Sequence, residues 1–179
     1  GPKGVGALVL RQGVDFVPQL RGGGQEMGRR AGTENLIGIA GFAAAATAAM
    51  RDLANGVWEE VTQIRNILDS ALSSFGFETI SVGNDVARLP NTLCLIAPGW
   101  KGETQVMAMD LAGFAISAGS ACSSGKVKAS RVLKAMGFDE ARAGQAIRLS
   151  IGPGVSREDV LRFAEVWGRE YARIRSREM

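Results

Sequence analysis

Short apolar runs alternate with helical segments from residue 77 onward, and this alternation constrains the fold more than any other feature of the chain. We expect strands over four of these runs, at 77–82, 91–97, 114–117 and 146–151. Helices are expected over 103–112, over 130–136 and after Ser156, where Ser156-Arg157-Glu158-Asp159 has the pattern of a capping box. The chain therefore predicts an α/β (α+β) sandwich of roughly four strands, mixed or antiparallel, covered by helices.

The chain opens on a turn that leads at once into the apolar run 5–10. This run has the length of a strand, and a buried strand needs partners with which to pair. We therefore expect the start of the sequence to have been cut from a larger protein.

A loop rich in glycine and arginine follows over 21–32, and an alanine-rich helix is expected over 36–55 with Thr33 as its N-cap. A helix start beside such a loop suits an anion, although the glycines match neither common phosphate motif. Thr33 is therefore either a cap alone or a cap whose hydroxyl also contacts an anion.

The break at Asn55-Gly56 precedes a second, amphipathic helix that starts at Val57. We place the domain boundary at this break. Residues 1–56 are then expected to depend on other protein segments, and residues 57–179 to form a self-sufficient domain.

Charge and composition exclude several classes of function. A formal net charge of +3 is too small for a nucleic-acid-binding surface. The apolar stretch 39–50 is too short to span a bilayer, so we expect a cytoplasmic protein without membrane or nucleic-acid partners. With two cysteines and no histidine, the chain offers no Cys/His zinc site and no histidine catalyst.

The two cysteines have very different surroundings. Cys122 follows an expected strand in a run of small residues, and Lys126 and Lys128 nearby favour its thiolate form. It is either a reactive thiol or a cysteine that happens to occur in a loop. Cys94 lies inside an apolar run and is expected to be a small core residue, so we expect no disulfide.

Arg148 stands in the middle of the apolar strand 146–151. A half-buried arginine is costly without a partner, and its planar guanidinium fits a carboxylate bidentately. The arginine therefore belongs either to a structural ion pair or to a ligand site.

Five motifs occur in order along the chain: GPKG-x-GAL, GGGQE-x-G-x-R-x-GTEN, SAGSACSSG, VL-x-AMG and IRLSIG. In this order they resemble the C-terminal part of cysteine desulfurases, in the class V aminotransferase group with the pyridoxal-phosphate fold of type I. The resemblance implies that 57–179 is the small C-terminal domain and that 1–56 is the tail of the large cofactor-binding domain.

The resemblance assigns three site residues. Cys122 matches the nucleophile that takes the substrate sulfur as a persulfide, and Arg148 matches the arginine that binds the substrate α-carboxylate. Thr33 matches the residue that contacts the cofactor phosphate across a homodimer interface. Around it the loop departs from the family, because Met27, Arg29 and Ala31 stand where arginine, an apolar residue and serine are frequent.

The implied parent enzyme converts L-cysteine to L-alanine and passes sulfur to an acceptor or iron–sulfur scaffold protein. Its Schiff-base lysine would precede Gly1, so we expect this chain alone to be inactive and to hold pyridoxal phosphate without a covalent bond. The alternatives are a selenocysteine lyase, another class V enzyme or, for the fragment itself, a non-catalytic dimerisation module.

Overall fold

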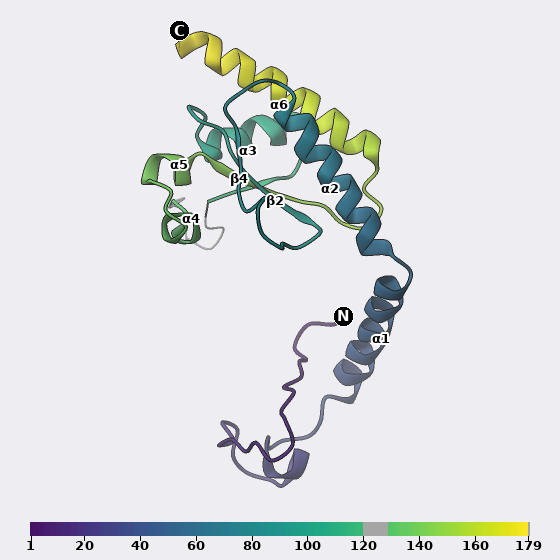
Figure 1. Cartoon of the computed structure of the whole chain (residues 1–179). Helices are drawn as coiled ribbons and strands as arrows, with labels where there is room; N and C mark the ends of the chain where they lie inside the picture. Colours follow the sequence, from purple (N-terminus) through teal and green to yellow (C-terminus); the bar gives the residue numbers. More distant parts are fainter. Residues whose placement is uncertain (120–128, 179) are drawn as a thin grey trace. The chain divides into compact units, whose positions relative to one another are not determined.

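The computed structural model describes residues 1–119 and 129–178 of the chain (Figure 1). The chain divides into two compact units, Gly1–Asn55 and Gly56–Met179. This division lies one residue from the boundary expected from the sequence. The assignment of the units to a large and a small enzyme domain stays a prediction.

The first unit contains the short 3-10 helix η1, Gln25–Gly28, and the helix α1, Leu36–Ala54. Residues 5–10 do not form a strand, so that expectation is wrong for this chain. Leu8 and Val9 are 71% and 92% exposed. A strand exists only where a neighbour accepts and donates backbone hydrogen bonds, and residues 1–55 form no strand that could pair with it.

The N-cap of α1 is Asn35, so the expectation of Thr33 in this role is wrong. Asn35 Oδ1 accepts a hydrogen bond from the backbone N–H of Gly38 at 3.0 Å. The cap must be the residue directly before the first helical turn, because its side chain has to reach the third helical N–H. Thr33 lies two positions too early for that contact.

Helix α1 is 19 residues long and mostly apolar, with charges only at Arg51 and Asp52, and its mean hydropathy reaches 1.4. By length and composition it could cross a membrane, in contrast to the expectation drawn from the shorter stretch 39–50. Several of its apolar side chains are exposed within the unit, among them Leu36, Ile37, Met50 and Leu53. Residues 1–55 thus present an apolar helix that they do not cover themselves.

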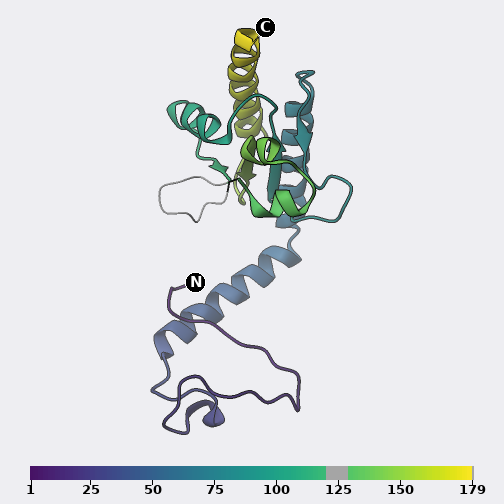
Figure 2. The same cartoon turned by 90° about the vertical axis from the view of Figure 1, so that its left-hand side faces the viewer.

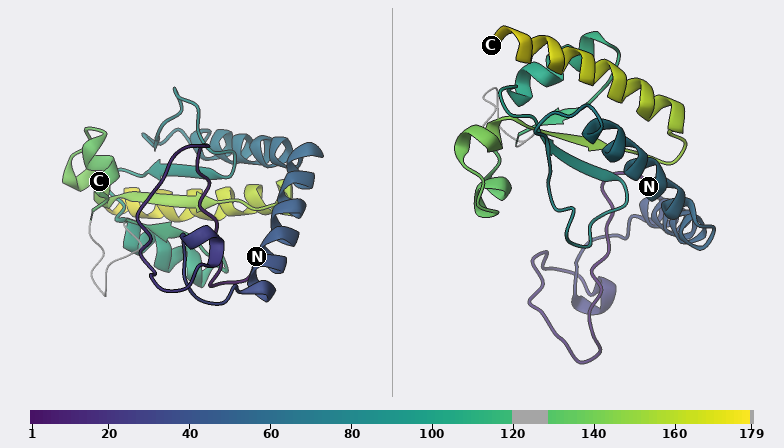
Figure 3. Two further views of the ribbon diagram at one scale, coloured as in Figure 1. Left: turned by 90° about the horizontal axis from the view of Figure 1, so that it is seen from below. Right: turned by 45° about the horizontal axis from the view of Figure 1, so that its top comes forward.

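The second unit is built on a four-stranded antiparallel sheet, as expected (Figures 1 and 3). Its order is β1-β2-β4-β3, where the strands are β1 Ile80–Ser81, β2 Thr92–Ile96, β3 Ser117–Ala118 and β4 Ala146–Ser150. The central pair β2 and β4 is the longest, so the middle of the unit is also its best-paired part.

One face of the sheet is covered by α2, Val57–Ser73, and α6, Arg157–Glu178, which run side by side across it (Figure 3). Helix α3, Gly102–Leu111, packs at the edge formed by β3. Alternate strand residues enter this core because successive side chains point to opposite faces. Its largest fully buried members are Trp100, Trp167, Tyr171, Leu72, Leu93, Leu95, Met109 and Ile147.

A buried glutamine of α3 forms hydrogen bonds with segments outside its own helix, including α6. Gln105 Nε2 donates to the carbonyl oxygens of Trp100 and Gln145, both at 2.9 Å, and its Oε1 accepts from Trp167 Nε1 at 3.0 Å. The start of the same helix touches β4, where a Cβ at Gly102 would lie 2.6 Å from the carbonyl oxygen of Ala146. Only glycine permits this approach.

The opposite face of the sheet is covered only in part. The short helices α4, Arg131–Ala135, and α5, Glu140–Gly144, pack over one end of it, as Figure 2 shows. Helix α5 was not expected, because five residues are too few to show a helical period. Beyond the small cluster under α4 and α5, this face carries the exposed residues Arg148 and Ser150.

Candidate functional site

Arg148 occupies the middle of β4 on the partly open face of the sheet. Its neighbours in the register are Cys94 of β2 on one side and Ser117 of β3 on the other. The side chain is exposed and makes no hydrogen bond or ion pair with any residue in 1–119 or 129–178. A structural ion pair was one of two interpretations of this arginine, and the described part of the chain contains no partner for it.

Cys94 lies on the same face as Arg148, which the sequence did not indicate. It is a free cysteine and only partly buried, packed against the small cluster under α4 and α5. Burial raises the pKa of its thiol, and the charge of Arg148 opposes this with a smaller effect. The thiol is therefore neutral at pH 7 and does not compensate the guanidinium charge.

The surroundings of Arg148 thus favour the ligand interpretation. Its two strand neighbours are small and uncharged, so the five guanidinium N–H donors are available on one face. A guanidinium of this kind can hold a carboxylate through two parallel hydrogen bonds. A rigid central strand fixes the position of its backbone.

Cys122 lies outside the described residues, so its expected role is neither supported nor opposed by the geometry. The elements on both sides of its segment are described. Strand β3 ends at Ala118, which pairs with Ile147 beside Arg148. Helix α4 follows the segment and is capped by Ser130, whose Oγ accepts from the backbone N–H of Leu133.

In the first unit, Arg30 organises the glycine-rich loop. It forms an ion pair with Glu26 at 2.6 Å and donates to the carbonyl oxygens of Gly32 at 2.7 Å and Thr33 at 3.2 Å. Glu26 and Met27 both adopt left-handed backbone conformations, which non-glycine residues seldom do. Such strain is held by surrounding contacts and occurs often at functional sites.

Arg30 also fixes the backbone of Thr33, whose side chain is exposed. The Thr33 hydroxyl makes no hydrogen bond within the described chain, so it is free to donate to an external oxyanion. Thr33 belongs to the first unit and Arg148 to the second.

The comparison with known families decides what kind of protein carries this site. Residues 1–163 match the family described as aminotransferase class-V. The chain belongs to this family. Class V membership agrees with the order of motifs along the chain and with the mixed helix and sheet fold.

Relatives of the class V chain are cysteine desulfurases. One from Cereibacter sphaeroides is 40% identical over 166 residues, which are 93% of this chain and 42% of the relative. "Cysteine desulfurase IscS 1" from Archaeoglobus fulgidus is 38% identical over 98% of this chain and 46% of its own length. The chain thus spans less than half the length of these relatives.

The fold of this class V chain is also similar to that of solved structures of NifS-like proteins. A NifS-like protein from Rickettsia africae superposes with a TM-score of 0.75 at 29% identity, over 89% of this chain and 41% of that one. A second NifS-like protein gives the same TM-score at 31% identity, over 91% of this chain and 41% of its own.

Class V relatives named cysteine desulfurase imply pyridoxal phosphate as cofactor of the parent enzymes, and one residue of this chain fits part of it. The free, backbone-anchored hydroxyl of Thr33 suits a phosphate oxygen. Lys3 belongs to the opening turn, and we do not assign it as the Schiff-base lysine.

Sequence reasoning missed the position of Cys94 beside Arg148. The signal was present, because antiparallel pairing of the runs 91–97 and 146–151 in this register places the two residues opposite each other. The register itself could not be derived, since a shift by one residue moves every side chain to the other face.

Proposed function

We propose that this chain is the part of a pyridoxal-phosphate-dependent cysteine desulfurase that binds the substrate carboxylate and accepts its sulfur. The observation that carries the proposal is Arg148, whose guanidinium pairs with no residue in 1–119 or 129–178 and lies between two small neutral neighbours on the partly open face of the sheet. The relatives named cysteine desulfurase support this reading, and their names do not favour a selenocysteine lyase.

Arg148 would hold the α-carboxylate of L-cysteine by two parallel hydrogen bonds and so fix the orientation of the substrate. Pyridoxal phosphate, when bound, supplies an electron sink next to the substrate α-carbon, which weakens the bond from Cβ to sulfur. The Cys122 thiolate would attack the substrate sulfur, forming an S–S bond as the C–S bond breaks. The electron pair stays on carbon, which takes up a proton to give L-alanine.

Thr33 would donate its hydroxyl to the cofactor phosphate across a homodimer interface. The ion pair between Arg30 and Glu26 supports this role by fixing the loop before Thr33. The persulfide on Cys122 would pass to a sulfur-acceptor or iron–sulfur scaffold protein, as the relatives named IscS and NifS suggest. We place the enzyme in the cytoplasm.

The test uses the full-length parent enzyme with Arg148→Lys, Arg148→Gln and Cys122→Ser. Both arginine variants should raise KM for L-cysteine, by about tenfold or more, because a lysine cannot reproduce the bidentate grip. Cys122→Ser should still bind L-cysteine but form no persulfide. The proposal fails if Arg148→Gln leaves KM unchanged, or if Cys122→Ser releases alanine and sulfide at the wild-type rate.

A further inference from the structure

An open pocket of about 580 Å³ lies between α2 and the segment 84–88 that leads toward β2. We call it the α2 pocket. It is lined by Arg65, Asn66, Asp69, Ser70, Ser73, Asn84, Val86, Ala87 and Arg88. None of these residues lies on the sheet face that carries Arg148, so the pocket is separate from the site described above.

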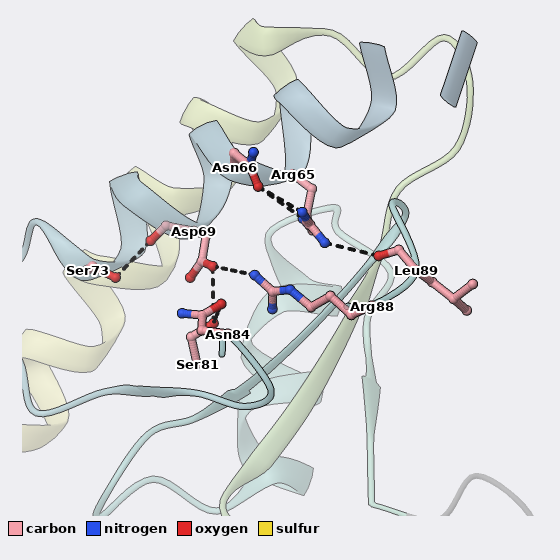
Figure 4. A network of polar contacts seen from close by, with 8 residues as sticks. All are labelled: Arg65, Asn66, Asp69, Ser73, Ser81, Asn84, Arg88 and Leu89. Carbon is pink, nitrogen blue, oxygen red and sulfur yellow. Dashed lines mark hydrogen bonds and ion pairs between the residues drawn. The ribbon is translucent and has the colours of Figure 1, made fainter. Parts of the chain in front are cut away.

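The α2 pocket contains more positive than negative charge. Arg88 Nη2 pairs with Asp69 Oδ2 at 2.9 Å (Figure 4). Arg65 is 8% exposed, and its acceptors among the described residues are neutral, namely Asn66 Oδ1 and the carbonyl oxygen of Leu89. Two guanidinium groups therefore share one carboxylate among the lining residues, and a buried charge without a counter-ion is costly.

Two of the lining residues each have a buried polar atom that finds no hydrogen-bond partner in the described part of the chain. They are Arg88 Nη1, a donor, and Asp69 Oδ1, an acceptor. Buried groups of this kind are usually satisfied by a bound ion or water. The walls add neutral donors, since neither the amide groups of Asn66 and Asn84 nor the Ser70 hydroxyl donates to a described acceptor.

We propose that the α2 pocket binds a small oxyanion that carries a proton, of the phosphate class. Its charged oxygens would accept from Arg65 and Arg88, which supplies the missing negative charge. Its P–OH group would donate to Asp69 Oδ1. Sulfate and simple carboxylates have no such proton at neutral pH, so Asp69 would repel them and the pocket would discriminate against both.

The test is a titration of the full chain at constant ionic strength, followed by the NMR signals of the Arg65 and Arg88 side-chain Nε–H groups. Inorganic phosphate should shift both signals saturably, and sulfate or acetate should bind at least about tenfold more weakly. A parallel titration with methyl phosphate separates the two sources of the ligand. Tighter binding of the ester indicates a phosphate carried on a larger molecule, and tighter binding of phosphate indicates the free ion.

Three variants test whether phosphate binding depends on the charge of the pocket and on Asp69. Asn84→Asp adds a negative charge to the pocket but keeps the acceptor for Ser81, and it should weaken phosphate binding at least about tenfold. Gln63→Glu adds the same charge to the exposed surface of α2 and should leave binding unchanged. Asp69→Asn should remove the preference for phosphate over sulfate.

Three results would overturn the proposal. The first is the absence of saturable shifts, and the second is an equal response to phosphate and sulfate in the unmodified chain. The third is equal binding by Asn84→Asp and Gln63→Glu. If Asp69→Asn does not fold, the comparison of phosphate binding by Asn84→Asp and Gln63→Glu still tests the proposal.

Discussion

Cys94 lies beside Arg148 in the register of β2 and β4, so its thiol reports on the neighbouring guanidinium. Burial raises the pKa of Cys94, and Arg148 opposes that rise by stabilising the thiolate. Only the thiolate is alkylated, so the reaction rate follows the thiolate fraction. The pair can therefore be studied in this chain without cofactor or substrate.

Arg148→Gln should raise the pKa of Cys94 further, because the variant removes the charge of Arg148, which favours the thiolate. The rate of iodoacetamide labelling at Cys94 should rise only at alkaline pH in the unmodified chain, and at still higher pH in the variant. Peptide mapping by mass spectrometry gives the rate for Cys94 alone. Arg142→Gln, on α5, is the matched control, and equal pH profiles for Arg148→Gln and the unmodified chain would contradict the coupling.

The availability of Arg148 for carboxylates can be tested on the same thiol. Iodoacetate carries a carboxylate and iodoacetamide does not, so the ratio of their labelling rates cancels the thiolate fraction. We expect Arg148 to attract iodoacetate and Arg148→Gln to lower this ratio several-fold, with Arg148→Lys between the two. A ratio that does not respond to either variant would show that the guanidinium is not available to a carboxylate beside Cys94.

At the scale of elements, the start of α1 distinguishes a helix cap from a ligand contact. Asn35→Ala should destabilise the helix by about 1 kcal/mol, because the N–H of Gly38 loses its acceptor. Thr33→Ala should leave the helix unchanged, since Asn35 is the cap. Amide hydrogen exchange over Leu36–Ala54 measures both effects, and equal losses of protection would contradict the assignment of the cap.

Gln105 is the polar contact that joins α3 to α6 through Trp167. Gln105→Ala should lower the free energy of unfolding of the second unit by about 3 kcal/mol, because it leaves a buried N–H unpaired and opens a cavity. Gln63→Ala, exposed on α2, should change it by less than about 0.5 kcal/mol. Urea unfolding followed by tryptophan fluorescence gives both values, and a small loss for Gln105→Ala would count against this role.

The elements that the sequence predicted well are marked by residues close together in the sequence. The capping box of α6 is confirmed, since Ser156 Oγ accepts from the Asp159 N–H while Asp159 Oδ2 accepts from Ser156. These hydrogen bonds lower the pKa of Asp159, so their contribution to α6 is present above about pH 4 and is lost as the carboxylate is protonated at lower pH.

The features that the sequence did not predict depend on distant residues. The run 5–10 has strand composition but no strand beside it within residues 1–55, and Cys94 changes face with the register of β2 and β4. The α2 pocket joins Arg65 to Arg88 through a loop, and no pattern in the sequence links the two. The roles proposed for Cys122, Arg148 and Thr33 rest on the order of five motifs, and no single motif indicates them.

At the scale of the whole chain, the two units differ in how much they bury. Gly38 is the only buried residue of the first unit, all of which is described, whereas the second unit contains both apolar clusters. Limited proteolysis should therefore cut first within the loop 21–32 or at Asn55-Gly56 and leave a stable fragment of the second unit. First cleavage within α2 or α6, or uniform resistance of 1–56 in a monomer, would contradict this organisation.

The central claim is that this class V chain supplies the thiol that accepts the substrate sulfur. The most direct test is the mass of the Cys122 peptide from the full-length enzyme after a single turnover with L-cysteine, without reducing agents. We predict that this peptide gains one sulfur atom as L-alanine is released, and that Cys122→Ser shows neither change. Release of L-alanine and sulfide at the normal rate, with Cys122 unmodified or replaced by serine, would contradict the claim.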